Sequence, residues 1–259
     1  MMTDKLMPKV IEKLDEILRL VKEADKEVLS IYKSNDLDIK IKKDKTAVTN
    51  ADIIAHKILT DGLRNLFPSI PIVSEEGDEE QNRRTIRSEY FWLIDPIDGT
   101  NEFISKTDQF TVCIGLIENN IPSIGIVSAP ALGVTYYGGH NFGSYKLAGL
   151  DKTQLHVPLN KVGIVTSSRS KINKRTKKYI DEHYPKAKIL TVGSQLKFTY
   201  VAEGKVDAYP RLGSSMSLWD IAAGQAILEG AGGSVKRPDG SLVNYHSEDL
   251  LAGDFIASI

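Results

Sequence analysis

The sequence predicts a layered α/β protein of α+β type, built as two lobes. Its 259 residues, of which 41% are apolar, suffice to bury a full core. Short apolar strands dominate the middle of the chain, and strands alternate with helices from about residue 162. We therefore expect an N-terminal α+β lobe over residues 1–155 and a C-terminal α/β lobe over residues 156–259, with a soft boundary between about 150 and 160.

Two helices are expected to precede the sheet. Residues 5–33 carry apolar side chains at spacings of three, four and seven, which predicts an amphipathic helix. Residues 35–45 are charged and lack an apolar run, which indicates a mobile loop or a marginal hairpin. Thr49 or Asn50 can cap a second helix that runs to about residue 67. Asp52 falls in its first turn, where its simplest role is to complement the helix dipole.

The middle of the chain is expected to form an antiparallel or mixed sheet. Two apolar runs flank Glu118-Asn119-Asn120 and predict a β-hairpin. Residues 78–88 are dense in charge and indicate a surface excursion. Pro96 has no N–H to donate, so the strand before it should end at Asp95. The expected strands cover residues 70–74, 90–95, 111–117, 121–129, 134–137 and 144–147.

The last hundred residues alternate between the two types of element. The final predicted helix, over residues 218–230, is rich in small residues that allow close packing on a sheet. Asp220 lies in its first turn. Before it we expect strands over residues 163–167, 188–192 and 206–209 and helices over residues 171–183 and 194–202.

Composition excludes several classes of function. Thirty-three basic and 34 acidic residues give a net charge of −1, which does not indicate a nucleic-acid coat or a membrane-surface binder. The single cysteine, Cys113, rules out an internal disulfide framework and is better explained as a buried core thiol than as a nucleophile. No run approaches 18 apolar residues, so no membrane span is expected. We expect a soluble, cytoplasmic protein.

One stretch of sequence brings together groups that could bind a metal and a phosphate. The apolar run over residues 90–94 delivers two carboxylates at its end, Asp95 and Asp98. Gly99 allows close approach of the backbone to an anion, and Thr100 could open a helix whose free N–H groups face a phosphate. The alternative is that Asp-Pro and Asp-Gly are ordinary turn dipeptides.

Two further acids have similar positions in the predicted fold. Glu75 follows a short strand and Asp220 begins a helix, so four acids lie where α/β folds gather ligands. Carboxylate oxygens suit Mg²⁺ or Mn²⁺ rather than Zn²⁺, and the histidines form no ligand-spaced pair. Acids that converge in this way require a divalent cation. Phosphate ester hydrolysis is the chemistry that uses such an arrangement.

Four motifs carry a family resemblance across nearly the whole chain. They are Thr49-x-x-Asp52, Ser74-Glu75-Glu76, Asp95-Pro-Ile-Asp98-Gly-Thr100 and Trp219-Asp220-x-Ala-Ala-Gly224. In this order and spacing they resemble the lithium-sensitive, Mg²⁺-dependent phosphomonoesterases of the inositol monophosphatase superfamily. The resemblance implies a two-lobed αβαβα sandwich with the site in the crevice between the lobes.

Within that superfamily, the chain looks most like the 3'(2'),5'-bisphosphate nucleotidase branch of CysQ type. The supporting segments are 168–170, 193–198, 202–204 and 208–211. A guanidinium at Arg211 would suit a second phosphate, where inositol monophosphatases usually have an acid. The alternative is that Lys197 and Arg211 are surface charges. Two departures could shift substrate preference: Asn101 stands where a lysine is expected, and residues 213–218 lack the usual Gly-Pro-Thr-rich lead.

The resemblance implies a role for each matching residue. Asp98 would bind metal with Glu75, Asp95 and the Ile97 carbonyl, and Asp220 would complete a second site with two or three Mg²⁺ ions, or Mn²⁺, in all. Thr100 and Glu75 would orient and deprotonate the attacking water, and Asp52 would hold Thr100 or polarise a further water. Substrate contacts would come from Glu75, Ile97, Asp98, Gly99, Thr100, Ser194, Lys197, Arg211 and Asp220.

The implied activity is hydrolysis of the 3'-phosphate of adenosine 3',5'-bisphosphate to AMP and phosphate by metal-activated water. One alternative is an inositol monophosphatase or a broad-specificity sugar phosphatase. A rival from another class is a metal-dependent nucleotide-binding regulator without turnover, against which the intact acids and Thr100 argue. The sequence does not fix the oligomeric state, although homodimers are common among relatives.

Overall fold

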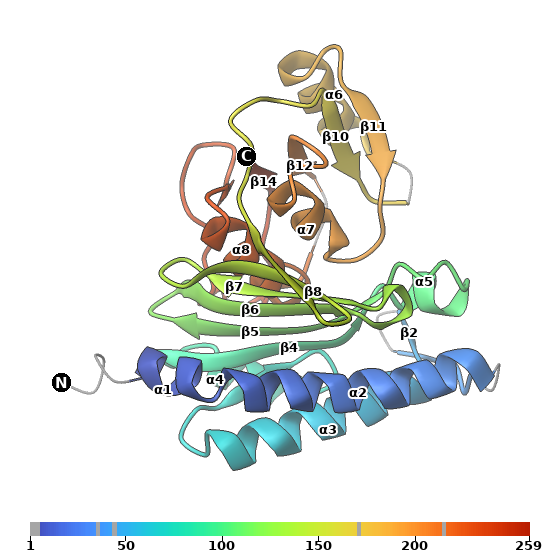
Figure 1. Ribbon diagram of the computed structural model, residues 1–259, viewed down its shortest axis with the longest axis vertical. Helices are drawn as coiled ribbons and strands as arrows, with labels where there is room; N and C mark the ends of the chain where they lie inside the picture. The colour runs from blue at the N-terminus through green and yellow to red at the C-terminus, as the bar shows by residue number, and fades with distance from the viewer. Residues whose placement is uncertain (1–5, 35–36, 43–45, 170–171, 214–215) are drawn as a thin grey trace.

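Five alternating layers of helix and sheet make up the chain (Figure 1). The computed structural model describes residues 6–34, 37–42, 46–169, 172–213 and 216–259. Helices α2 (Leu14–Ser34) and α3 (Asn50–Leu66) cover one face of a seven-stranded sheet. Helices α7 (Leu196–Ala202) and α8 (Ala222–Gly230) separate that sheet from a five-stranded one, and α6 (Lys174–His183) lies beyond it. The predicted αβαβα sandwich is confirmed.

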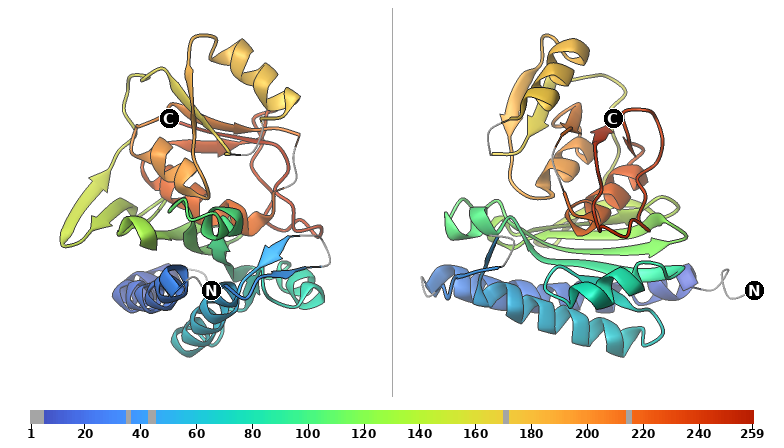
Figure 2. Two further views of the ribbon diagram at one scale, coloured as in Figure 1. Left: turned by 90° about the vertical axis from the view of Figure 1, so that its right-hand side faces the viewer. Right: turned by 180° about the vertical axis from the view of Figure 1, so that it is seen from behind.

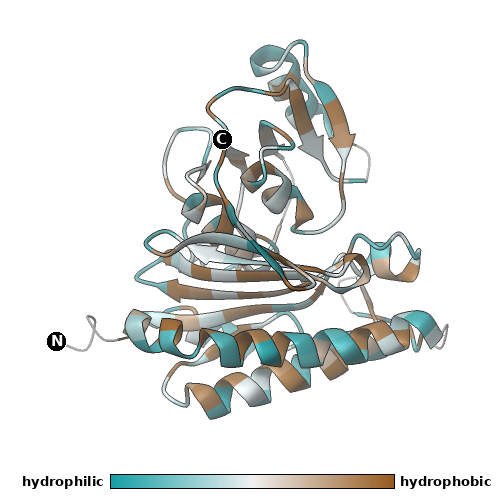
Figure 3. Cartoon of the chain, viewed as in Figure 1, coloured by the Kyte–Doolittle hydropathy of each residue, from teal (hydrophilic) through white to brown (hydrophobic). Residues whose placement is uncertain are grey.

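The two N-terminal helices bury one apolar face each. Ile17, Val21 and Val28 of α2 and Leu59 and Leu63 of α3 are 0–1% exposed. Hydrophilic and hydrophobic residues alternate along both helices (Figure 3), and both helices lie on the same side of the sheet in each view of Figure 2. The single helix predicted over residues 5–33 was wrong in one respect. It is divided at Lys13, which separates α1 (Leu6–Glu12) from α2.

The seven-stranded sheet follows chain order, β3-β4-β5-β6-β7-β8-β9. Strands β3 and β4 are parallel and all other neighbours are antiparallel. Asn119 and Asn120 both have positive φ (49° and 69°), as a tight hairpin turn requires. The strands are β3 (Ile72–Ser74), β4 (Tyr90–Asp98), β5 (Thr111–Glu118), β6 (Ile121–Ala129), β7 (Val134–Gly139), β8 (Gly143–Ala148) and β9 (Asp151–Leu155).

The five-stranded sheet has the order β11-β10-β12-β14-β13. The predicted alternation is present as β10 (Ile164–Ser167), α6, β11 (Lys188–Thr191), α7 and β12 (Ala208–Arg211). Its last two strands, β13 (Ser234–Lys236) and β14 (Phe255–Ser258), were not predicted. Each is too short to show alternation in the sequence, and β14 pairs with β12 across more than forty residues.

Two local predictions need correction, and one segment predicted on the surface contains a helix that was not predicted. The charged segment 78–88 contains a helix, α4 (Glu79–Thr85), which is capped by Asp78 and stabilised by i,i+4 ion pairs rather than by an apolar face. The helix predicted over residues 218–230 begins as a separate 3₁₀ turn, η3 (Leu218–Asp220). Strand β4 does not end at Asp95 but continues through Pro96 to Asp98.

Several smaller elements complete the chain. Residues 35–45 contain part of a hairpin, in which β1 (Lys40–Ile41) pairs with β2 (Ala47–Val48). A short helix, α5 (Thr100–Ile104), follows β4, and a 3₁₀ turn, η2 (Pro130–Leu132), follows β6. Parts of five predictions lie outside the described residues: 5 at the first helix start, 35, 36 and 43–45 of the loop, 170 of the segment 168–170, 171 at a later helix start, and 214–215 of the segment before η3.

The proposed division near residue 155 follows the boundary between the sheets. All strands of the seven-stranded sheet precede it, and all strands of the five-stranded sheet follow it. One core cluster nevertheless contains Phe91 and Val127 from the first part together with Phe198 and Leu228 from the second. The two parts of the chain therefore share a core, and their division into lobes stays a prediction.

Candidate active site

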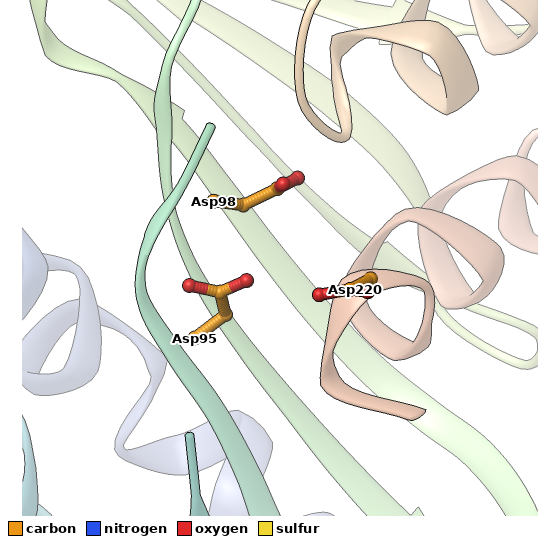
Figure 4. A group of neighbouring side chains, drawn as sticks. All are labelled: Asp95, Asp98 and Asp220. Atoms are coloured by element: carbon orange, nitrogen blue, oxygen red, sulfur yellow. The ribbon is translucent and has the colours of Figure 1, made fainter. Parts of the chain in front are cut away.

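Three carboxylates converge between the two lobes. One oxygen each from Asp95, Asp98 and Asp220 lies within 4.8 Å of the others. Asp95 and Asp98 project from β4, and Asp220 faces them from η3, before α8 (Figure 4). The structure therefore brings together acids that are more than 120 residues apart in the sequence.

A bulge in β4 explains why two acids three residues apart share a side. In a regular strand, residues i and i+3 point to opposite faces. Here Asp95 pairs with Cys113 and Asp98 with Thr111, so three steps on β4 span two on β5. The extra residue returns Asp98 to the side of Asp95. Pro96 lies within this irregular stretch, where its missing N–H is tolerated.

The backbone after Asp98 turns sharply toward α5. Gly99 has φ +93°, in the left-handed region that favours glycine. A Cβ at this position would lie 3.3 Å from the Gln109 carbonyl oxygen and 3.4 Å from Cβ of Ser194. Thr100 begins α5, and its hydroxyl donates to the Ile97 carbonyl oxygen over 3.3 Å. This turn places Thr100 and Asp98 on the same cavity.

A cavity of about 420 Å³ contains most of the predicted site residues. Glu75, Asp95, Ile97, Asp98, Gly99, Thr100 and Asp220 line it, together with Asn101 and Glu102. The β1–β2 hairpin closes one side through Ile41 and Ala47. Asp52, Ser194, Lys197 and Arg211 are not among its lining residues.

Glu75 lines the cavity, and its carboxylate is hydrogen-bonded to Lys42, a residue that the sequence analysis did not predict to be near the site. Lys42 Nζ donates to Glu75 Oε1 over 2.9 Å and to Glu76 Oε1 over 2.5 Å. Asn82 fixes the strand end before Glu75, since its side chain bonds both the N–H and the carbonyl of Ser74. No sequence pattern singles out Lys42, because it is one of several lysines in a charged, non-periodic segment.

The acid cluster contains carboxylates that repel one another. Burial, together with the charges of neighbouring acids, raises the pKa of Asp98 to about 7 and that of Asp220 to about 8. The same causes raise the pKa of Asp95 well above its usual range. Among the described residues, Asp95 Oδ1 is buried without a hydrogen-bond partner. A hard cation would supply the missing partner and remove the repulsion.

Asp52 has a clear structural role. Its Oδ2 accepts from the N–H of Thr49 over 2.8 Å and from its hydroxyl over 2.6 Å, which completes a capping box at the start of α3. The residue is 1% exposed, and burial raises its pKa to about 6. Glu75 and Lys42 are the charges that act on it most. The contact between Asp52 and Thr100 stays a prediction.

Three of the predicted substrate-binding residues, Ser194, Lys197 and Arg211, lie in the C-terminal half of the chain, at or on α7 and β12. Lys197 is 5% exposed, so its interpretation as a surface charge is wrong. Its Nζ donates to the Ser194 carbonyl oxygen over 2.5 Å, and burial lowers its pKa while the charge of Asp98 opposes that shift. Arg211 Nη1 donates to Ser168 Oγ over 3.0 Å. Its Nε is buried without a hydrogen-bond partner among the described residues.

The fold and this arrangement of acids define a known class of protein. The chain belongs to the inositol monophosphatase family, whose model matches residues 11–258. Among curated proteins it is 36% identical to the 3'(2'),5'-bisphosphate nucleotidase CysQ of Escherichia coli K12, over 95% of this chain and 99% of that protein.

Solved structures agree with this assignment. CysQ from Bacteroides thetaiotaomicron has a TM-score of 0.80 and 30% identity, covering 92% of this chain and 94% of that one. The inositol monophosphatase of Thermotoga maritima has a TM-score of 0.77 and 28% identity, covering 95% and 92%. Both relatives therefore share the fold over almost its full extent.

Proposed function

We propose that the protein is a metal-dependent 3'(2'),5'-bisphosphate nucleotidase that hydrolyses the 3'-phosphate of adenosine 3',5'-bisphosphate to AMP and phosphate. The observation that carries the proposal is the adjacency of two opposite charge sets. The Asp95, Asp98 and Asp220 carboxylates can hold cations, and Lys197 with Arg211 can hold an anion beside them. The curated CysQ relatives that match nearly the whole chain support this activity.

The donor set fits a hard divalent cation. We assign Glu75, Asp95, Asp98, Asp220 and the Ile97 carbonyl as ligands of two or three Mg²⁺ ions, for which Mn²⁺ can substitute. The unpartnered oxygen of Asp95 and the raised pKa values of the cluster favour this assignment. When bound, the ions supply Lewis-acid polarisation of the phosphoryl oxygens and a nucleophilic water at neutral pH.

The remaining chemistry belongs to side chains and backbone groups around the cavity. The water oxygen attacks phosphorus in line, and the bond from phosphorus to the ribose 3'-oxygen breaks. Thr100 orients the water and Glu75 accepts its proton, for which Glu75 must leave Lys42. The N–H groups of Gly99 and Thr100 hold the phosphoryl oxygens. The 3'-oxygen leaves and takes up a proton from solvent water, and Asp52 keeps Thr100 in place.

The far end of the substrate is assigned to the C-terminal lobe. Ser194 would contact the nucleoside, and Lys197 and Arg211 would bind its second phosphate. The Nε of Arg211 is buried without a hydrogen-bond partner in the described part of the chain, so this guanidinium is suited to charge-assisted bonds with phosphate oxygens. The charges of both Asp98 and Arg211 act on Lys197. The Lys197 ammonium group can therefore neutralise negative charge at either phosphate of the substrate.

The second candidate is an inositol or sugar monophosphatase. The similarity to the Thermotoga enzyme and the presence of Asn101 in place of the expected lysine favour it. A panel of adenosine 3',5'-bisphosphate, inositol 1-phosphate and fructose 1,6-bisphosphate, assayed for phosphate release with Mg²⁺, distinguishes the two. The proposal expects the highest kcat/KM for the bisphosphate nucleotide. A preference for inositol 1-phosphate would overturn it.

The proposal includes a cytoplasmic location and a homodimer. No helix within the described residues is long and apolar enough to cross a membrane. Cell fractionation tests the location, and size-exclusion chromatography with light scattering tests the assembly.

A further inference from the structure

The start of α7 is tied to both sides of the acid cluster through one buried residue, Gln195. Its side chain is 0% exposed, and both ends of its amide are used. Nε2 donates to the Trp219 carbonyl oxygen over 2.9 Å, and Oε1 accepts from the Gly224 N–H over 2.7 Å. These two partners flank Asp220, one directly before it and one in the first turn of α8.

The backbone of Gln195 faces the other side of the cluster. Its N–H interacts with the Asp98 carboxylate. The residue before it, Ser194, has φ +51°, a conformation that is unfavourable for a non-glycine residue and persists only where the surroundings enforce it. Gly193 cannot carry a side chain, because a Cβ there would lie 2.6 Å from the Gln109 carbonyl oxygen. Fixed neighbours therefore hold Ser194 on both sides.

Close packing of α7 on α8 makes this link feasible. A Cβ at Gly224 would lie 2.6 Å from the Phe198 ring, so glycine is needed for the helices to approach. At that separation the Gln195 amide spans from one helix start to the other. The link is a side-chain bridge between two helix starts: the backbone N–H at the first interacts with Asp98, and the second follows Asp220 in the chain.

We infer that Gln195 is a positioning residue for the metal site: it sets the distance between Asp98 and Asp220 by bridging the starts of α7 and α8. The inference rests on the proposed function for its catalytic consequence, but the bridge itself acts on metal binding. Partners that orient metal ligands typically change metal affinity by about 10- to 100-fold when removed. Gln195 acts through Trp219 and Gly224, so we expect the lower end of that range.

Gln225 provides a matched control. It is also a buried glutamine with both amide ends bonded, to Glu229 Oε1 over 2.9 Å and to the Tyr245 hydroxyl over 2.8 Å. Within the described residues, its side-chain hydrogen bonds do not include the acids of the cluster. Gln195→Met and Gln225→Met each replace an amide by a side chain of similar length that lacks these hydrogen bonds. Both should lower the unfolding temperature of the metal-free protein.

Mn²⁺ binding to the metal-free full-length chain, measured by electron paramagnetic resonance and calorimetry, separates positioning from general stability. We expect Gln195→Met to weaken Mn²⁺ binding about tenfold and Gln225→Met to change it less than twofold. Equal Mn²⁺ affinity in the two variants would overturn the inference. Should Gln195→Met fail to fold, Gln195→Leu takes its place in the same comparison.

Activity gives a second readout and keeps the two proposals distinguishable. With saturating Mg²⁺, Gln195→Met should recover much of its kcat, whereas at limiting Mg²⁺ it should be about tenfold less active than Gln225→Met. A kcat deficit that no Mg²⁺ concentration restores would contradict a role through the metal. If the wild type releases no phosphate from any substrate of the panel, the proposed function fails, while the Mn²⁺ comparison still tests Gln195.

Discussion

The two sides of the candidate site carry excess charge of opposite sign. On the N-terminal side, Asp95 and Asp98 converge with Asp220, and one Asp95 oxygen is buried without a partner among the described residues. On the C-terminal side, Lys197 and Arg211 are adjacent cations, and the Arg211 Nε is likewise buried and unpartnered in the part of the chain that the structure describes. Buried polar atoms are rarely left unpaired. We therefore propose that a cation binds on the first side and an anion on the second.

This comparison separates catalysis from substrate choice. Loss of an acid should remove turnover on every substrate, whereas loss of a cation on the other side should discriminate between substrates. Four predictions follow the difference from the largest expected effect to the smallest.

Asp98→Asn should lower kcat/KM by about 10³-fold on all substrates, because a metal-site carboxylate contributes several kcal/mol to the transition state. The same change removes a half-buried charge that neighbouring acids repel, so the metal-free variant should unfold at the same temperature as the wild type or higher. Phosphate release and thermal unfolding measure the two effects. Asp181→Asn, on the exposed face of α6, is the control and should behave like the wild type. Turnover near the wild-type level in Asp98→Asn would contradict the site.

Arg211→Glu should weaken binding of the substrate's second phosphate without affecting the acid cluster. Replacing a charge-assisted partner of phosphate by a repulsive carboxylate should raise KM for adenosine 3',5'-bisphosphate about 30-fold or more. KM for inositol 1-phosphate, which lacks the second phosphate, should change far less. Steady-state kinetics on both substrates test this, with Arg64→Glu on α3 as the control. A similar rise for both substrates would argue against a second-phosphate site.

The sequence analysis identified the acids of the site but did not predict the backbone geometry that brings them together. Asp95, Asp98 and Glu75 were found because each ends an apolar strand, a local signal. The bulge that turns Asp98 back beside Asp95 depends on pairing with β5, and Pro96 suggested a strand end instead. Lys42 and Gln195 act through partners 33 and 24 or more residues away, which no local pattern records. The helix α4 was missed because ion pairs and a cap, not apolar spacing, stabilise it.

The acid side should also respond to pH. Because the folded-state pKa values of Asp98 (about 7) and Asp220 (about 8) lie above their unfolded value, these groups favour the metal-free fold at low pH. That contribution is lost as pH rises from about 4 to about 8. Metal must displace the same protons, so Mn²⁺ affinity should rise about tenfold or more between pH 6 and pH 8. Calorimetry in buffers of different ionisation enthalpy measures affinity and proton release together. Affinity that is flat over this range would show that the cluster is already ionised at pH 6.

The smallest expected effect concerns Lys42, which lies on the acid side but supplies a cation. It shares Glu75 with the proposed metal site, so it competes with the metal for that carboxylate. The pair is partly exposed, with 21% of each side chain accessible, and is worth about 1 kcal/mol or less. Lys42→Gln should therefore tighten Mn²⁺ binding about two- to fivefold.

Lys40→Gln is the matched control for this prediction. It removes an exposed ion pair with Asp38 at the start of the same hairpin, and it should leave Mn²⁺ affinity unchanged. Weaker binding in Lys42→Gln than in Lys40→Gln would mean that Lys42 holds Glu75 in place for the metal instead of competing with it. The sign of this difference in Mn²⁺ affinity decides whether Lys42, in the β1–β2 hairpin, competes with the metal for Glu75 or positions Glu75 to bind it.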